Sequence, residues 1–294
     1  MKSRSGLLLQ TALAPAIWGS TYIVTTEFLE GFPPITVALL RALPAGLLLL
    51  LITRQLPKGI WWLRVFVLGA LNFSVFLSLL FIAAYRLPGG VAATIGAIQP
   101  LIVVFLAYLL LGNPIRLVSI LAALIGAAGV ALLVLTPRAA LDPLGIVAGL
   151  VGAVSMACGI VLNRKWQPPV PPLTFTAWQL TAGGLLLVPV VLLAEPAMPM
   201  PSLANLAALA WLGLIGMALT YLLWLRGIAR LDPATVSPLL LLSPVTAVLL
   251  GWLCLHQSLS PLQVAGGVLV VGSIWLGQRA GRKAMTAATG TARG

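Results

Sequence analysis

The sequence that decides the fold is RLPGGVAATIGAIQP, residues 86–100, because a diverged copy of it, RLDPATVSPLLLLSP, occupies residues 230–244. Both stretches begin with Arg-Leu, both end on a proline (Pro100 and Pro244), and they lie 144 positions apart. This offset is about half of the 294 residues. The pattern therefore predicts a chain built from two copies of one unit.

The composition predicts an integral membrane protein. Hydrophobic residues make up 61% of the chain and charged residues 7%, whereas a soluble domain carries about 25% charged residues. The net charge of +12 does not indicate nucleic-acid binding, because the lysines and arginines stand mostly singly or in pairs between apolar segments. The two cysteines, Cys158 and Cys254, have no metal-site spacing and form no disulfide framework. We expect membrane lipids as the surroundings.

The apolar segments predict ten transmembrane helices, since a span needs about 20 mainly apolar residues. The expected spans are 7–26, 34–53, 63–84, 89–111 and 117–136, then 144–163, 173–193, 204–225, 233–254 and 261–278. With five spans in each half, the second copy crosses the membrane in the opposite sense. We expect an all-α membrane protein of two inverted repeats, 1–138 and 139–278, with a disordered basic tail, 279–294. Secondary transporters commonly have this architecture, with the substrate site between the halves.

The charge distribution predicts that both termini are cytoplasmic. If the N-terminus is cytoplasmic, fourteen lysines and arginines fall in the predicted cytoplasmic loops and termini, and only Arg86 and Arg138 fall in the predicted outer loops. Positive charge collects on the cytoplasmic side of membrane proteins. No cleavable signal peptide is evident. The expected location is a bacterial plasma (inner) membrane, with multiple passes.

Polar side chains inside the spans are candidates for a substrate site, because lipid offers them no partner. Arg41 is the clear charge within a span, and it would either bind a substrate carboxylate or phosphate or extend outward to Glu27 or Glu30. Asn72 and Gln179 are amides within spans and belong to the same candidate set.

The matched prolines mark two further candidate positions. A proline within a span frees a backbone carbonyl and kinks the helix, and such breaks form binding sites in transporters. Gln99, beside Pro100, is well placed to contact a substrate, and Ser243, beside Pro244, is its counterpart. The alternative, compatible with the first, is that the prolines only shape the helices.

Four aromatic residues lie deep within the spans: Trp18, Trp178, Tyr221 and Trp224. Together they would stack on a flat or cationic substrate. Packing within the helix bundle is the alternative role.

The sequence lacks the motifs that ion coupling, ATP binding or catalysis would need. No Asp or Glu lies well within a span, so no carboxylate relay for proton or sodium coupling is evident. The sole histidine, His256, lies at the rim of a span, and no phosphate-binding loop or hydrolase triad can be assembled. We expect no enzyme activity, cofactor or metal. Small-residue pairs such as Gly266-Gly267 allow close helix packing, and homodimerisation stays open.

An ordered set of short motifs runs through the chain: Ile17-Trp18-Gly19-Ser20-Thr21, Phe32-Pro33-Pro34, Leu40-Arg41, Leu110-Leu111-Gly112 and Trp252-Leu253-Cys254. The set resembles the EamA-type members of the drug/metabolite transporter superfamily over residues 5–278. That family often has a Glu thirteen residues after each of the two prolines. Asn113 and Gln257 occupy those positions here, so the charge of that Glu is missing.

The resemblance implies transport of small organic molecules such as amino acids or drugs. We expect an exporter that works by alternating access, as a facilitator or exchanger because no coupling carboxylate is evident. A proton-coupled exporter is the alternative. A polytopic membrane enzyme or a channel fits the sequence less well.

Overall fold

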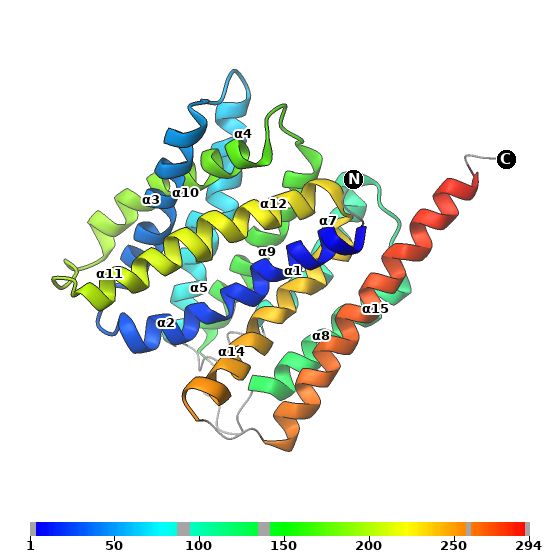
Figure 1. The fold of residues 1–294 in the computed structure, drawn as a ribbon. Coiled ribbons are helices and arrows are strands. Elements are labelled where there is room, and N and C mark those ends of the chain that lie inside the picture. Colours follow the sequence, from blue (N-terminus) through cyan, green and yellow to red (C-terminus); the bar gives the residue numbers. More distant parts are fainter. Residues whose placement is uncertain (1–3, 87–94, 135–141, 257–259, 292–294) are drawn as a thin grey trace.

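The computed structural model describes residues 4–86, 95–134, 142–256 and 260–291, which form helices and no β-strand (Figure 1). Within these ranges, seven helical stretches are long and apolar enough to cross a membrane: Ser5–Thr25, Pro34–Thr53, Trp61–Leu80, Pro143–Lys165, Pro172–Ala194, Leu203–Arg230 and Pro233–Cys254. Three shorter apolar helices are Gln99–Leu111, Leu117–Leu132 and Pro261–Gly277. The chain is therefore a multi-pass membrane protein. The count of ten spans stays a prediction, and part of the predicted span 89–111 lies outside the described residues.

The first half contains α1 (Arg4–Trp18), α2 (Ser20–Phe28), α3 (Pro34–Thr53), α4 (Trp61–Gly69), the π-helix η1 (Ala70–Ser74), α5 (Val75–Arg86), α7 (Gln99–Leu111) and α8 (Leu117–Val134). The second half contains α9 (Pro143–Lys165), α10 (Pro172–Ala194), α11 (Leu203–Ala210), the π-helix η2 (Trp211–Leu219), α12 (Thr220–Arg230), α13 (Pro233–Val236), the 3₁₀ helix η3 (Ser237–Leu241), α14 (Leu242–Cys254) and α15 (Pro261–Thr291). Many of these helices begin at a proline, whose fixed φ suits the first helical position and whose missing N–H is not needed there.

The C-terminal tail differs from the prediction. The sequence predicts disorder from residue 279, but α15 continues as a helix to Thr291. The Ala, Met, Lys and Arg residues of this segment are good helix formers, which explains the continuation. Figure 1 shows the end of α15 projecting beyond the other helices.

Two helix pairs join the halves through close backbone contact: α3 with α10, and α8 with α15 (Figure 1). A Cβ added at Gly46 of α3 would lie 2.7 Å from the Leu180 carbonyl carbon of α10. One added at Gly129 of α8 would lie 2.9 Å from the Gly266 carbonyl oxygen of α15. Small residues at these positions let the helices approach closely, as membrane bundles require.

Side chains fasten the α3–α10 pair at both ends. At one end, the Glu195 carboxylate after α10 accepts hydrogen bonds from the Ile35 and Thr36 N–H groups of α3, at 2.7 and 2.6 Å. A carboxylate is favourable at a helix N-terminus because the helix dipole is positive there. At the other end, the Trp178 indole of α10 donates to the Gln55 carbonyl at 2.6 Å. The three bonds fix this antiparallel pair as a unit.

The two described π-helices occupy corresponding places in the halves. Adding the 144-residue offset to η1 gives residues 214–218, which lie within η2. A π-helical turn is wider than an α-helical one and occurs frequently at functional sites. The sequence pattern did not predict these turns. The two π-helices thus lie one predicted repeat length apart in the chain.

The matched prolines also lie at breaks in the helices. Pro100 is in the first turn of α7, directly after the turn at residues 97 and 98. Pro244 is in the first turn of α14, directly after the 3₁₀ helix η3. Each half therefore interrupts its fourth apolar segment at the same place.

Candidate functional site

An aromatic cluster joins the two halves at the π-helices. The Trp18 ring, at the end of α1, lies 5.0 Å from the Tyr221 ring and 5.5 Å from the Trp224 ring, both on α12. The Phe73 ring of η1 lies 4.5 Å from Tyr221. Trp18 is half-buried and the other three are buried. We call Trp18, Phe73, Tyr221 and Trp224 the aromatic cluster.

The Trp18 indole binds the second π-helix directly. Its Nε1–H group donates to the Gly216 carbonyl of η2 at 3.0 Å and lies 2.8 Å from the Thr220 hydroxyl oxygen. The Thr220 hydroxyl donates to the same Gly216 carbonyl at 2.7 Å. A tryptophan from the first half thus holds an irregular turn of the second.

An amide chain lies beside the aromatic cluster. Asn72 of η1 donates from Nδ2 to Gln179 Oε1 at 3.0 Å, and Gln179 donates from Nε2 to Asn163 Oδ1 at 2.9 Å. The three residues are 2%, 0% and 4% exposed. Buried amides of this kind are costly unless bonded. The Nδ2 group of Asn163 has no hydrogen-bond partner among the described residues.

The missing side chain of Gly159 leaves space for the amide chain. A Cβ at Gly159 of α9 would lie 2.6 Å from Asn72 Cγ. Two hydroxyls also bond across elements here: Ser155 of α9 donates to the Leu71 carbonyl at 2.9 Å, and Ser74 to the Gly183 carbonyl at 2.8 Å. The η1 helix is therefore bound to both α9 and α10, which belong to the other half: its Leu71 carbonyl accepts from α9, and its Ser74 hydroxyl donates to α10.

The two π-helices use equivalent positions. Asn72 and Gly216 are 144 residues apart. Asn72 bonds to Gln179 of the second half, and Gly216 accepts from Trp18 of the first. Each irregular turn thus takes its partner from the opposite half, although the side chains that do so differ.

The first turn of α14, which contains Ser243 and Pro244, packs against the chain directly after Trp18. A Cβ at Gly19 would lie 2.6 Å from both the Ser243 carbonyl oxygen and the Thr246 Cβ of α14. Ser243 and Pro244 are half-buried. The contact at Gly19, which directly follows Trp18, therefore brings the first turn of α14 close to the aromatic cluster.

Gln99 and Pro100 have different neighbours. Both are buried on α7, which packs against α9, α8, α13 and η3. The Nε2 group of Gln99 has no hydrogen-bond partner among the described residues. The matched prolines thus lie beside different helices.

Two other candidates, Trp178 and Arg41, belong to neither the aromatic cluster nor the amide chain, and Arg41 lies close enough to Tyr221 to interact with it electrostatically. Trp178 uses its indole N–H to fasten the end of α10, as described above. Arg41 is 6% exposed, and a Cβ at Gly213 of η2 would lie 3.5 Å from the Arg41 carbonyl oxygen. Arg41 is therefore buried where α3 meets η2.

Sequence reasoning missed Phe73, Asn163 and Ser155. Asn163 directly precedes the charged pair Arg164-Lys165, where the sequence predicts the end of a span and not a site. The feature of the sequence that could have identified Asn163 is its amide side chain within the predicted span 144–163. Phe73 and Ser155 carry no distinguishing signal in a chain rich in apolar and small residues.

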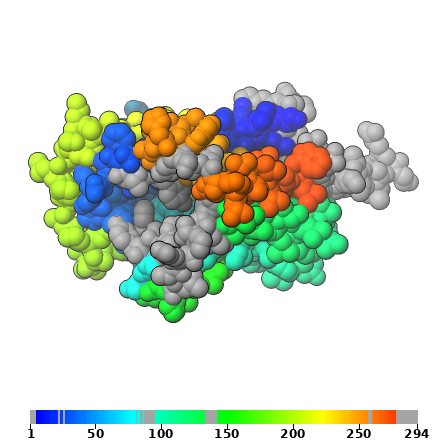
Figure 2. Space-filling model, turned by 90° about the horizontal axis from the view of Figure 1, so that it is seen from below, coloured from blue at the N-terminus to red at the C-terminus, as the bar shows by residue number. Residues whose placement is uncertain are grey.

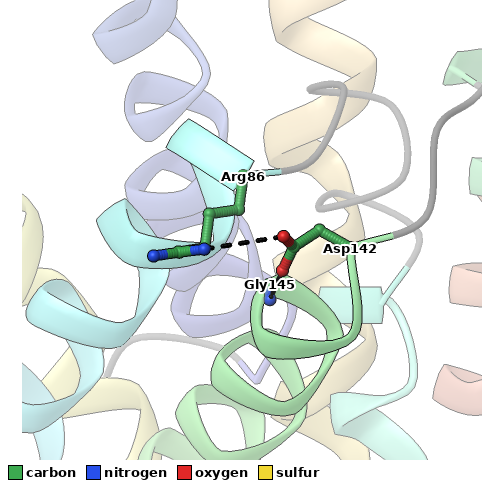
Figure 3. Close-up of polar contacts among 3 residues, drawn as sticks. All are labelled: Arg86, Asp142 and Gly145. Carbon is green, nitrogen blue, oxygen red and sulfur yellow. Dashed lines mark hydrogen bonds and ion pairs between the residues drawn. The ribbon is translucent and has the colours of Figure 1, made fainter.

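Arg86 and Asp142 form an ion pair away from these residues (Figure 3). Arg86 Nη1 lies 3.5 Å from Asp142 Oδ2, and Asp142 Oδ1 accepts from the Gly145 N–H at 2.8 Å. Both charged side chains are exposed to a third or more, so the pair contributes little to stability. It fastens the end of α5 to the start of α9.

Two open cavities lie elsewhere on the described part of the molecule. A groove of ≈ 640 Å³ between α14 and α15 is lined by aliphatic residues, Trp275 and the polar Gln263. Figure 2 shows both helices on the surface. None of the lining residues belongs to the aromatic cluster or the amide chain. In the part of the chain that the structure describes, no group of three His, Cys, Asp or Glu could hold a metal ion.

The chain is similar to known transporters. The model of the EamA-like transporter family matches residues 5–135 and 143–277. Protein PecM of Dickeya dadantii is 47% identical over 263 residues, which are 89% of this chain and 88% of that protein. The uncharacterized inner membrane transporter YedA of Escherichia coli is 31% identical over 86% of this chain and 85% of its own.

A solved structure, described as "Crystal structure of protein", has the same fold. Its TM-score is 0.81 at 23% sequence identity, and the match covers 95% of this chain and all of that one.

Proposed function

The chain belongs to the EamA-like transporter family, and we propose that it exports small organic molecules, such as amino acids or drugs, by alternating access. Its relatives support the coarser statement that it is a membrane transporter of small molecules. The observation that carries the finer proposal is the meeting of the aromatic cluster and the amide chain at the two π-helices. Irregular backbone occurs at membrane depth only where protein buries it or a cavity adjoins it.

We further propose ten spans in two inverted repeats, with cytoplasmic termini, in a bacterial inner membrane. The charge count supports the orientation. The pairing of α3 with α10 and of α8 with α15 supports the repeats, because each pair joins corresponding segments of the two halves. The two separate stretches of the family match agree with this division. YedA is named an inner membrane transporter, which supports the location.

The proposed substrate site lies between the halves, among Trp18, Asn72, Gln179, Tyr221 and Ser243. The aromatic rings would contact flat parts of a substrate, and the amides would exchange their mutual bonds for bonds to it. In the present conformation these groups contact one another, so the site is packed shut. Opening requires the halves to move relative to each other at the broken helices.

Other predicted site residues keep narrower roles in this proposal. Pro100 and Pro244 would act as hinges, because each lies where helical bonding is interrupted. Gln99 would present its unpartnered Nε2 donor near the first hinge. Arg41 would place a buried positive charge beside η2 that favours anionic groups. Trp178 would stabilise the fold and not touch the substrate.

Transport without ion coupling is the expected mode. The five acids, Glu27, Glu30, Asp142, Glu195 and Asp232, lie at helix ends or in the connections. The test is uptake by proteoliposomes that contain only this protein, with and without a pH gradient. We expect equal final uptake in both. A strict need for the gradient would support the proton-coupled alternative.

The substrate is to be found by a thermal-shift screen of metabolites on the purified protein, because a ligand that binds only the folded state raises its apparent stability. Trp18→Phe should weaken the response to the best compound. Trp62→Phe, at a tryptophan exposed on the surface of α4, is the matched control. Equal responses from the two variants would contradict the placement of the site.

A further inference from the structure

We propose that Asn113 and Asp232 form a latch that holds the cytoplasmic side of the transport pathway closed. Asn113 Nδ2 donates to Asp232 Oδ1 at 2.6 Å. The bond joins the residue after the C-cap of α7 to the residue before α13, and hence the two halves. The inference rests on the proposed function and on the predicted orientation, which places both residues on the cytoplasmic side.

The end of α7 fixes the position of Asn113. Gly112 ends the helix in the left-handed conformation, at φ 69°, which glycine adopts without strain. The Asn113 N–H then donates back to the Ala107 carbonyl at 3.2 Å. The Asn113 side chain therefore moves with α7, and its bond reports the distance between α7 and α13.

Burial shows which part of the pathway is closed. The chain that follows Asp232 is buried: three of the four residues of α13 are buried, and so are all but one of the residues of η3. The α7 helix packs against both elements. In α14, which continues the same predicted span toward the outer side, only Gly251 is buried. The cytoplasmic portion of this span is thus more deeply buried than the outer portion. The latch lies at the more buried end.

The chemistry suits a bond that opens and closes. Both residues are half-buried, so water can replace each partner when the bond breaks. A carboxylate acceptor makes the hydrogen bond stronger than one between neutral groups. The amide supplies the proton permanently, so the bond needs no protonation step to form. This agrees with a carrier that is not coupled to protons.

The test follows the exposure of the packed segment. Ser237 of η3 is fully buried, so Ser237→Cys, in a background with Cys158→Ala and Cys254→Ala, reports opening. The reporter is labelled with a membrane-impermeant maleimide from the cytoplasmic face of inside-out vesicles. Adding Asn113→Ala should raise the labelling rate about threefold to tenfold, the factor expected for one lost hydrogen bond.

Two further variants make the result specific. Asn205→Ala removes another amide bond between the halves, from Asn205 Nδ2 to the Phe28 carbonyl at 2.6 Å, on the predicted outer side. It should leave cytoplasmic labelling unchanged. Asp232→Asn keeps an acceptor oxygen opposite Asn113 and should raise labelling less than Asn113→Ala does.

The outcomes separate the latch from the proposed function. Labelling that Asn113→Ala does not change, or that Asn205→Ala raises equally, would overturn the latch alone. A reporter that no variant exposes from either face would contradict alternating access, and the latch with it. The melting temperature of each variant shows that it is folded.

Discussion

The amide chain offers the sharpest test of the packing at the π-helices, through the substitution Gln179→Met. Methionine has nearly the same length as glutamine but no donor or acceptor of comparable strength. Gln179 is fully buried and makes two hydrogen bonds, at 3.0 Å from Asn72 and 2.9 Å to Asn163. The variant therefore leaves one donor and one acceptor unpaired in the interior.

The magnitude follows from these two bonds. Hydrogen bonds between helices in a membrane contribute about 0.6 kcal/mol on average and at most about 1.7 kcal/mol. Two lost bonds should therefore lower the free energy of unfolding by about 1 to 3 kcal/mol. Adding Asn72→Leu removes the orphaned donor as well, so the double variant should lose less than the sum of the single losses.

The assay is reversible unfolding in mixed micelles, followed by tryptophan fluorescence. Gln167→Met is the matched control, because Gln167 is exposed and its amide donates to the Ala229 carbonyl at 3.1 Å. We expect a loss below about 0.5 kcal/mol for it. A loss of this small size for Gln179→Met, or strict additivity in the double variant, would refute the amide chain as a coupled network.

Other positions give independent tests. Gly46→Ala should destabilise the protein by about 1 to 3 kcal/mol because its Cβ meets the α10 backbone, whereas Gly96→Ala, with open space, should not; thermal unfolding compares them. Trp178→Phe should lower the melting temperature but leave ligand affinity unchanged, and weakened binding measured by titration would contradict its placement. Glu195→Gln should cost about 1 kcal/mol, since it removes the charge at the start of α3, and an unchanged unfolding curve would contradict that role.

The sequence predicted the architecture better than the site. The architecture has local signals in the sequence: long apolar segments, positive charges in the loops between them, and matched prolines. These signals predict a membrane protein with two repeats and interrupted helices. The π-helices η1 and η2 have no local signal, because a widened turn depends on what its carbonyls bond to. Gly216, for example, is one glycine among 29 until Trp18 is seen to bond to it.

The site required tertiary contacts that spacing does not reveal. Asn72 and Gln179 were recognised as polar residues within spans, but their direct bond joins positions 107 residues apart. Trp178 and Trp18 looked alike in the sequence, and only the structure separates them: one fastens a helix end and the other meets the aromatic cluster. Asn113 was noted for a missing charge, and its bond to Asp232 gives that amide a role.

Counterflow in proteoliposomes tests the central claim, a carrier whose site lies between the two halves, most directly. The compound with the largest thermal shift is loaded unlabelled inside, and uptake of its labelled form is followed without a pH gradient. The account predicts that internal compound accelerates uptake and that Trp18→Ala, but not Trp62→Ala, abolishes the acceleration. A flux that rises linearly with concentration and ignores the internal compound would contradict it.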